Sequence, residues 1–152
     1  MTEKSGDALS ASLEDYLEAI AEIIEEHGHA HTRDIAEKLN VKMPSVTNAL
    51  WSLSRQSYII YQPNQPVLLT ETGQTIAKSV IRRHEALKRF FQNILCVEPG
   101  KANSVACKIE HVIDQDIADR FIVYMDIMSN RTDAQERIAI LMKSLEKIRR
   151  EE

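Results

Sequence analysis

The sequence contains few of the residues that break or cross-link a chain. Among its 152 residues are only 4 glycines, 4 prolines and 2 cysteines. So little glycine and proline argues against a disordered or loop-rich chain, and two cysteines are too few for a disulfide framework. The hydrophobic content is 43%, which is ordinary for a globular protein. The chain is therefore suited to one or two small domains with a hydrophobic core.

Long apolar segments are also absent. No run approaches the roughly 20 residues that a membrane-spanning helix needs, and the N-terminal stretch MTEKSGDALSASLEDY lacks the apolar core of a signal peptide. We therefore expect a cytoplasmic protein with no membrane partner. Common enzyme and zinc-finger motifs are missing as well, since there is no GxSxG, Walker loop, GxGxxG, CxxC or HExxH.

Acidic residues are missing from one long stretch of an otherwise acidic protein. The formal net charge is -4, yet residues 38–70 contain no Asp or Glu, while Lys38, Lys42 and Arg55 remain. A carboxylate on a phosphate-facing surface would repel the nucleic-acid backbone. The acid-free stretch therefore favours DNA binding.

The spacing of apolar residues predicts a helix followed by a helix-turn-helix. The first helix covers about 12–27, with Ser12 as its N-cap and Gly28 at its end. A short helix capped by Thr32 follows, and the next helix carries Pro44 in its first turn. A plain helical hairpin that binds no DNA is the alternative interpretation of these two short helices.

The next segments favour DNA binding. YIIYQ and VLLT flank the turn PNQP and predict a β-hairpin, and a long helix over about 72–95 follows. This is the order of a winged helix, with the uncharged Gln62, Asn64 and Gln65 at the tip of the wing. We expect Arg55 and the wing to contact phosphates. The predicted contacts in the major groove are Lys42, Pro44, Ser45, Thr47 and Asn48.

The second half of the chain reads as helix throughout. Helices are predicted over about 102–112, over DQDIADRFIVYMDIM and over TDAQERIAILMKSLEKIRR. Their apolar stripes exceed what so small a monomer needs, so we expect a homodimer, with a self-contained bundle as the alternative. The predicted fold class is mainly α, with a winged helix-turn-helix domain at 1–72 and an all-helical dimerisation domain at 73–152.

The stretch CKIEHV contains three potential metal ligands. On a helix, Cys107, Glu110 and His111 share one face because they stand at positions i, i+3 and i+4. We expect the apolar Val105, Ile109 and Val112 on the opposite face. A thiol, a carboxylate and an imidazole would then lie on a side that the core does not use.

The other candidate ligands come from two earlier helices. Asp15 and Glu18 stand one turn apart and point away from the apolar stripe, and His84 lies within the stripe of the long helix. Each also has a simpler interpretation, since two acids in a first turn favour the helix dipole and a lone histidine is commonly a core residue. Three helices that meet would supply three oxygens, two imidazoles and one sulfur. Such a set suits Mn²⁺ or Fe²⁺, with Zn²⁺ or Co²⁺ also open because of the thiol.

The chain contains five characteristic stretches, in the order SLEDYLEAI, DIAEKLNVKMPSVTNAL, LLTETGQTIA, IRRHEALKRF and ACKIEHVID. In order and spacing they resemble the metal-dependent winged-helix repressors, the family of the diphtheria toxin repressor and the manganese transport regulators. The resemblance implies a homodimer that binds operator DNA when loaded with Mn²⁺ or Fe²⁺ and represses metal uptake. It also implies the two-domain form, because a chain ending at Glu152 lacks the SH3-like domain of longer members.

The ligand positions of that family carry over to this sequence one by one. They fall on Asp15, Glu18, His84, Cys107, Glu110 and His111. At positions 15 and 18, the residue types of this chain resemble those of the manganese regulators. At position 107, the cysteine resembles the iron-dependent members. Lys88 and Asn103 replace the glutamate and histidine of an ancillary site in the iron-dependent members. The resemblance therefore implies Mn²⁺ or Fe²⁺ as the favoured cofactor, with one or two ions per subunit.

Three alternatives explain part of the same pattern. A redox regulator would keep the winged helix and oxidise Cys107 or Cys96, although basic residues that would activate Cys96 are sparse. A small Mn²⁺ or Fe²⁺ enzyme would explain the ligands but not the winged-helix order, so we predict that the protein is not an enzyme. A purely structural dimerisation protein would explain only the apolar stripes.

Overall fold

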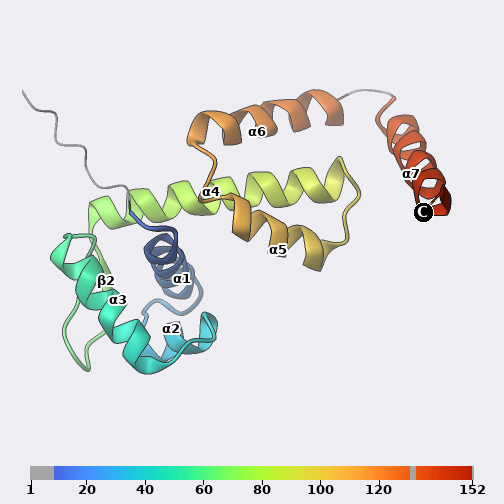
Figure 1. Cartoon of the computed structure of the whole chain (residues 1–152). Coiled ribbons are helices and arrows are strands. Elements are labelled where there is room, and N and C mark those ends of the chain that lie inside the picture. The colour runs from blue at the N-terminus through green and yellow to red at the C-terminus, as the bar shows by residue number, and fades with distance from the viewer. Residues whose placement is uncertain (1–8, 131–132, 152) are drawn as a thin grey trace, which may run out of the picture. The chain divides into compact units, whose positions relative to one another are not determined.

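The computed structural model describes residues 9–130 and 133–151 (Figure 1). Within them, a succession of helices is interrupted by one two-stranded sheet, which confirms the predicted mainly α fold class. None of the helices described is long and apolar enough to cross a membrane. The elements are α1 (Ala11–His27), α2 (Thr32–Lys38), α3 (Met43–Arg55), β1 (Ile59–Ile60), β2 (Leu68–Leu69), α4 (Glu71–Asn93), α5 (Pro99–Ile109), α6 (Gln115–Ser129) and α7 (Ala134–Glu151).

The chain divides into two compact units between Ile81 and Arg82, within α4. In the N-terminal unit, Leu17, Ile20 and Ile23 are buried along one face of α1. They belong to one cluster with buried side chains of α2, α3 and the hairpin, which include Ile35, Val46, Leu50, Leu53, Ile59 and Val67. Full burial of each large aliphatic side chain contributes roughly 1.5–3 kcal/mol, so this cluster fixes the three helices against one another. The predicted domain boundary at 72/73 stays a prediction.

Two predicted helix starts are wrong by one or two residues. Ser10 rather than Ser12 is the N-cap of α1, because its extended backbone lets its side chain accept an N–H of the first turn. His31 rather than Thr32 precedes α2. The predicted end of α1 is confirmed, since Gly28 is the C-cap with a φ of 81°, in the left-handed region that favours glycine.

The predicted hairpin is present, although its strands are shorter than the segments YIIYQ and VLLT. β1 and β2 pair antiparallel, with Ile59 opposite Leu69. An isolated bridge joins Val67 to Ala30, which lies between α1 and α2. The hairpin is thereby tied to the segment that leads into the helix-turn-helix.

The start of α4 is held close to the hairpin. The Thr70 hydroxyl lies 2.8 Å from the carbonyl oxygen of Ser57 and 2.9 Å from that of Tyr58, and it accepts the N–H of Gly73 at 3.1 Å. A Cβ added at Gly73 would lie only 2.0 Å from the Tyr58 carbonyl oxygen. Only glycine therefore fits where α4 passes the end of α3 and the hairpin.

In the C-terminal unit, α5 differs from the predicted 102–112 helix at both ends. It begins at Pro99 because Glu98 caps it and accepts two backbone N–H groups of the first turn at 2.9 Å each. These bonds lower the pKa of Glu98. The helix ends at Ile109, so Glu110 is its C-cap rather than an interior residue.

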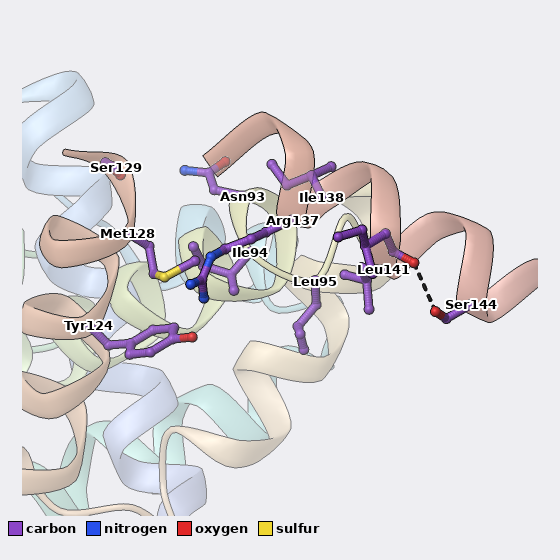
Figure 2. A pocket seen from close by; sticks show the side chains of 11 residues that line it. Asn93, Ile94, Leu95, Tyr124, Met128, Ser129, Arg137, Ile138, Leu141 and Ser144 are labelled. Carbon is purple, nitrogen blue, oxygen red and sulfur yellow. Dashed lines mark hydrogen bonds between the residues drawn. The ribbon is translucent and has the colours of Figure 1, made fainter. Parts of the chain in front are cut away.

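The apolar stripes predicted on the last two helices are only partly covered. Tyr124 on α6 is 45% exposed and Ile148 on α7 is 56% exposed. A cavity of about 550 Å³ is lined by residues of α6 and α7, among them Tyr124 and Leu141, and by the end of α4 with the adjoining Ile94. Figure 2 shows these side chains. This is apolar surface of the kind that the predicted dimer would cover. Thr132, at the predicted start of the last helix, lies outside the described residues.

Candidate metal centre and nucleic-acid interface

The carboxylate of Glu110 is fully buried beside two imidazoles. Its Oε2 lies 2.5 Å from Nδ1 of His84, and its Oε1 lies 3.4 Å from Nε2 of His111. Within the described residues, Oε1 has no hydrogen-bond partner, because the approach of His111 is an ion-pair distance without hydrogen-bond geometry. A buried acceptor without a partner costs about 1–3 kcal/mol. A cation at this oxygen would remove that cost.

The backbone around Glu110 explains its burial. The Arg83 guanidinium donates to the Glu110 carbonyl oxygen at 2.8 Å, and Ala102 and Ala106 are fully buried at the two preceding helical positions of the same face. The prediction that the core does not use the ligand face is therefore wrong for Glu110. Val112, expected on the buried side, is 80% exposed. The alanines at intervals of four residues were the signal in the sequence.

His84 lies on α4 and contacts Asn103 of α5 and Glu110 at the end of that helix, with 14% of its side chain exposed. Its Nε2 lies 3.0 Å from Oδ1 of Asn103, while its Nδ1 faces Glu110. Lys88 donates to Glu85 at 2.8 Å on the surface of α4. Lys88 and Asn103 stand at the positions of the ancillary site described above. In this chain Lys88 forms a surface ion pair with Glu85, and Asn103 contacts His84.

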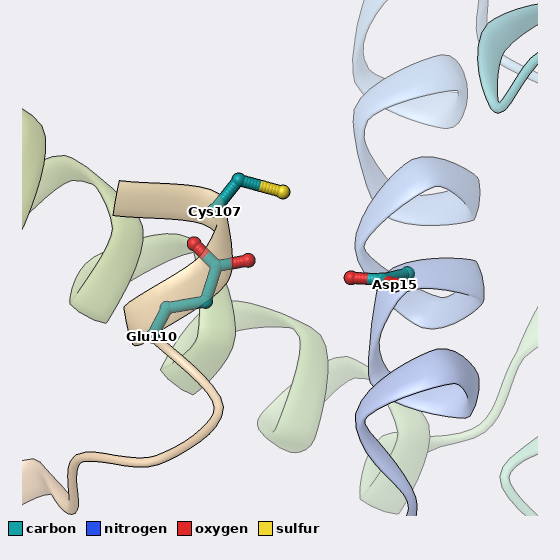
Figure 3. Close-up of side chains that lie close together, drawn as sticks. All are labelled: Asp15, Cys107 and Glu110. Atoms are coloured by element: carbon teal, nitrogen blue, oxygen red, sulfur yellow. The ribbon is translucent and has the colours of Figure 1, made fainter. Parts of the chain in front are cut away.

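The remaining predicted ligands are more accessible than Glu110. Cys107 has an exposed side chain on α5, and Asp15 and Glu18 are half-buried on α1. Figure 3 shows Asp15 on α1 and Cys107 on α5. Burial and the charge of Asp15 raise the pKa of the neighbouring Tyr16. Asp15 and Glu18 thus offer carboxylates in the N-terminal unit, and the other predicted ligands lie in the C-terminal unit.

The first turns of α3 carry the predicted DNA contacts. Pro44, Ser45 and Asn48 are exposed, as is Lys42 directly before the helix. Thr47 is half-buried, and its hydroxyl donates to the carbonyl one turn before it at 3.1 Å. Thr47 therefore presents its methyl group and hydroxyl lone pairs rather than a free O–H.

The three bases of the acid-free stretch are used differently. Lys38 turns toward α1, where its Nζ lies 3.0 Å from Glu22 and 3.7 Å from Glu26. Burial lowers the pKa of Lys38, but the hydrogen bonds and charges of these two carboxylates outweigh burial and raise it. Arg55 donates to a carbonyl of its own helix at 3.3 Å and is exposed, as is Lys42. Lys42 and Arg55 are therefore the bases of this stretch that remain for phosphates.

A cavity of about 310 Å³ separates α3 from the wing. Arg33 lines it together with Thr47 and Gln65, and Arg33 is exposed. Arg33 precedes the acid-free stretch, so the charge pattern of the sequence does not indicate it. Its place beside the wing makes it a further candidate for a phosphate contact. The predicted wing-tip residues are exposed, namely Gln62, Asn64 and Gln65.

The N-terminal unit has the element order of a winged helix, and the C-terminal unit is helical and carries four of the six predicted metal ligands. Two family models match the chain. The model described as "Iron dependent repressor, N-terminal DNA binding domain" matches residues 8–67, and "Iron dependent repressor, metal binding and dimerisation domain" matches residues 70–138. The chain therefore belongs to the iron dependent repressor family.

Similar proteins and structures agree with this assignment. An uncharacterized HTH-type transcriptional regulator of Methanocaldococcus jannaschii is 35% identical over 78% of this chain and 95% of that protein. The HTH-type transcriptional regulator MntR of Bacillus pumilus is 35% identical over 90% of this chain and 91% of that protein. The solved manganese regulator SloR aligns with a TM-score of 0.67 at 27% identity over 75% of this chain, and IdeR of T. acidophilum with 0.68 at 27% over 78%. This chain spans 53% and 56% of those two solved chains, about half their length.

These matches confirm the predicted family, with a DNA-binding domain followed by a metal-binding and dimerisation domain. The family consists of transcriptional repressors, which confirms that the protein is not an enzyme and sets aside the metalloenzyme alternative.

Proposed function

We propose that this protein binds operator DNA as a homodimer when it holds a divalent metal ion, with Mn²⁺ or Fe²⁺ favoured, and so represses genes of metal uptake. The observation that carries the proposal is the buried Glu110 carboxylate beside His84 and His111, with one oxygen that lacks a hydrogen bond among the described residues. Buried polar atoms in proteins are nearly always satisfied. A cation is the partner that suits a carboxylate between two imidazoles.

The residues present fit such an ion. His84, Glu110 and His111 would hold it from the C-terminal unit, together with Cys107, and Asp15 and Glu18 would contribute from α1. Oxygen and imidazole donors are suited to Mn²⁺ and Fe²⁺, while the thiol also suits Zn²⁺ or Co²⁺. The bound ion supplies positive charge that neutralises the buried carboxylate and the acids of α1.

The same residues can couple metal binding to DNA binding. Asp15 and Glu18 lie on the helix whose buried face packs with α2 and α3. Because a close-packed core transmits displacement, a restraint on α1 is passed to the recognition helix α3. In a dimer, that restraint would select the spacing of the two α3 helices that fits a palindromic operator. A coupling of about 1–3 kcal/mol changes DNA affinity by roughly 5–150-fold.

The test is the substitution Glu110→Gln, which keeps the side-chain shape and removes the charge. Mn²⁺, Fe²⁺ and Zn²⁺ are titrated separately into chelator-treated protein, and binding to upstream DNA fragments is followed by fluorescence anisotropy. We expect metal to increase the DNA affinity of the unaltered chain by roughly 5–150-fold and to have no such effect on the variant. Glu85→Gln is the matched control, because Glu85 is an exposed acid paired with Lys88 in the same unit.

Circular dichroism would establish that Glu110→Gln remains folded. A folded variant that still required metal for DNA binding would contradict this ligand assignment. DNA binding that ignored all three metals and responded to peroxide would favour the redox alternative at the exposed Cys107.

A further inference from the structure

The stretch HGHAH, which joins α1 to α2, carries three histidines outside the ligand set described above. The rings of His29 and His31 pack edge to face, with centroids 5.3 Å apart and 74° between their planes. His27 is the last residue of α1, and its Nε2 lies 3.7 Å from a carboxylate oxygen of Glu26. Two of the three histidines therefore form a pair.

Backbone pairing explains why these two rings meet. Ala30 is fully buried and bridges to Val67, whose N–H donates to the Ala30 carbonyl at 2.8 Å. In an extended segment, residues i and i+2 project from the same side and the residue between them from the other. The hairpin thus holds Ala30 in the core and leaves His29 and His31 side by side on the outer face.

The geometry of the pair suits two imidazoles on one metal ion. With metal–nitrogen distances of about 2.0–2.1 Å, two bound rings have centroids roughly 4.5–5.3 Å apart for ligand angles between about 90° and about 115°. The observed 5.3 Å lies at the upper end of that span. His29 is exposed, and within residues 9–130 and 133–151 its ring has no hydrogen bond or ion pair. The His31 side chain faces the backbone N–H of Asp34 in a capping box at the start of α2, so its other ring nitrogen is the one that would bind the ion.

We propose that His29 and His31 form a second metal site, which takes Zn²⁺, Ni²⁺ or Cu²⁺ with water in the remaining positions. Imidazole donors favour these late first-row ions over Mn²⁺, which prefers oxygen. The site lies wholly within the N-terminal unit and is independent of the proposed repressor function. Zinc titrations of the chain therefore contain one binding event more than manganese titrations.

The test is calorimetric titration of the chelator-treated full chain with ZnCl₂ and, separately, MnCl₂. The chain is compared with the double variant His29→Ala/His31→Ala and with the single variant His29→Ala. His27→Ala is the matched control, because it removes an exposed histidine of the same stretch that is not part of the pair. We expect the zinc stoichiometry to fall by one ion per chain in both variants of the pair and to be unchanged in His27→Ala. Manganese stoichiometry should be the same in all four proteins.

Paramagnetic Ni²⁺ gives a second readout, since it should broaden the imidazole NMR signal of His31 in the unaltered chain and leave that signal sharp in His29→Ala. Unchanged zinc stoichiometry in both variants of the pair would overturn the proposal. An equal loss in His27→Ala would also overturn it, because it would indicate unspecific capture by surface histidines. Circular dichroism checks the fold of each variant. If the unaltered chain showed no manganese-dependent DNA binding, that result would contradict the proposed repressor function and would not bear on the histidine site.

Discussion

Burial separates Glu110 from surface acids of the same unit. Glu85 and Asp116 form ion pairs with Lys88 and Arg120 on their own helices and are largely exposed. Exposed pairs of this kind contribute about 0–1 kcal/mol. Glu110 has no exposed surface, so water cannot compensate its charge and neighbouring groups must do so. This difference makes Glu110 the residue at which metal dependence is best tested.

A single base should account for one phosphate contact. We predict that Lys42→Ala weakens binding to specific and non-specific DNA alike, because Lys42 is exposed directly before α3. Loss of one phosphate contact lowers the slope of log affinity against log salt by about 1. Anisotropy titrations between about 50 and about 200 mM salt would measure this slope.

The matched control is Lys38→Ala, which removes the same charge from the same acid-free stretch. Lys38 is engaged with Glu22 and Glu26, so we expect the salt slope to be unchanged. Equal slopes for Lys42→Ala and the unaltered chain would exclude Lys42 from the phosphate contacts.

The position of α4 depends on one glycine. We predict that Gly73→Ala destabilises the N-terminal unit by about 1–3 kcal/mol or more, because the added Cβ would meet the Tyr58 backbone carbonyl. Urea unfolding followed by circular dichroism would measure the loss. Gln74→Ala is the control, since Gln74 is the next residue and is exposed. Equal stabilities of the two variants would mean that α4 can shift away from the hairpin at little cost.

The start of α5 depends on one carboxylate, and its contribution should vary with pH. The backbone N–H groups of Gly100 and Lys101 hold the pKa of Glu98 below its ordinary value of 4.5. A carboxyl group whose pKa is lowered in the folded state stabilises the fold above its unfolded pKa, and this contribution is lost as pH falls through the folded pKa. We therefore expect Glu98→Ala to melt below the unaltered chain at neutral pH, with the difference closing under acid conditions.

Thermal melts at a series of pH values would follow this difference. Glu85→Ala is the control, because the Glu85 carboxylate pairs with the Lys88 side chain and, within the described residues, accepts no backbone N–H. We therefore expect a smaller difference in melting temperature between Glu85→Ala and the unaltered chain. A difference for Glu98→Ala that stayed constant down to low pH would show that the loss comes from packing rather than from charge.

For the whole molecule, the proposed dimer sets a requirement on the DNA. Two recognition helices related by a two-fold axis bind half-sites about one helical turn apart, or a multiple of it. We predict that inserting about 5 bp between the half-sites of an operator abolishes metal-dependent binding, because the insertion rotates one half-site to the opposite side of the duplex. Electrophoretic mobility shift would measure this. Replacing the central bases without changing their number is the control, and unchanged binding after insertion would indicate that single subunits bind independently.

Local features of the sequence determined much of the fold and the choice of candidate ligands. The C-terminal end of α1 and the first turn of α3 follow from Gly28 and Pro44, whose backbone preferences act within a few residues. The order of helices and hairpin follows from apolar periodicity, which is also a local property. The resemblance added the matching order of five stretches, and the two family models confirm it.

Only the tertiary structure decided the environment of each ligand. His84 and Glu110 are 26 residues apart in the chain, and their contact depends on how α5 packs in the C-terminal unit. The same packing buries Glu110 and exposes Val112, the reverse of what helical spacing predicted. The charge of Lys38 is likewise taken up by α1, which no pattern within its own stretch indicates. The physical reason is that periodicity defines the faces of a helix, whereas burial depends on which neighbour covers each face.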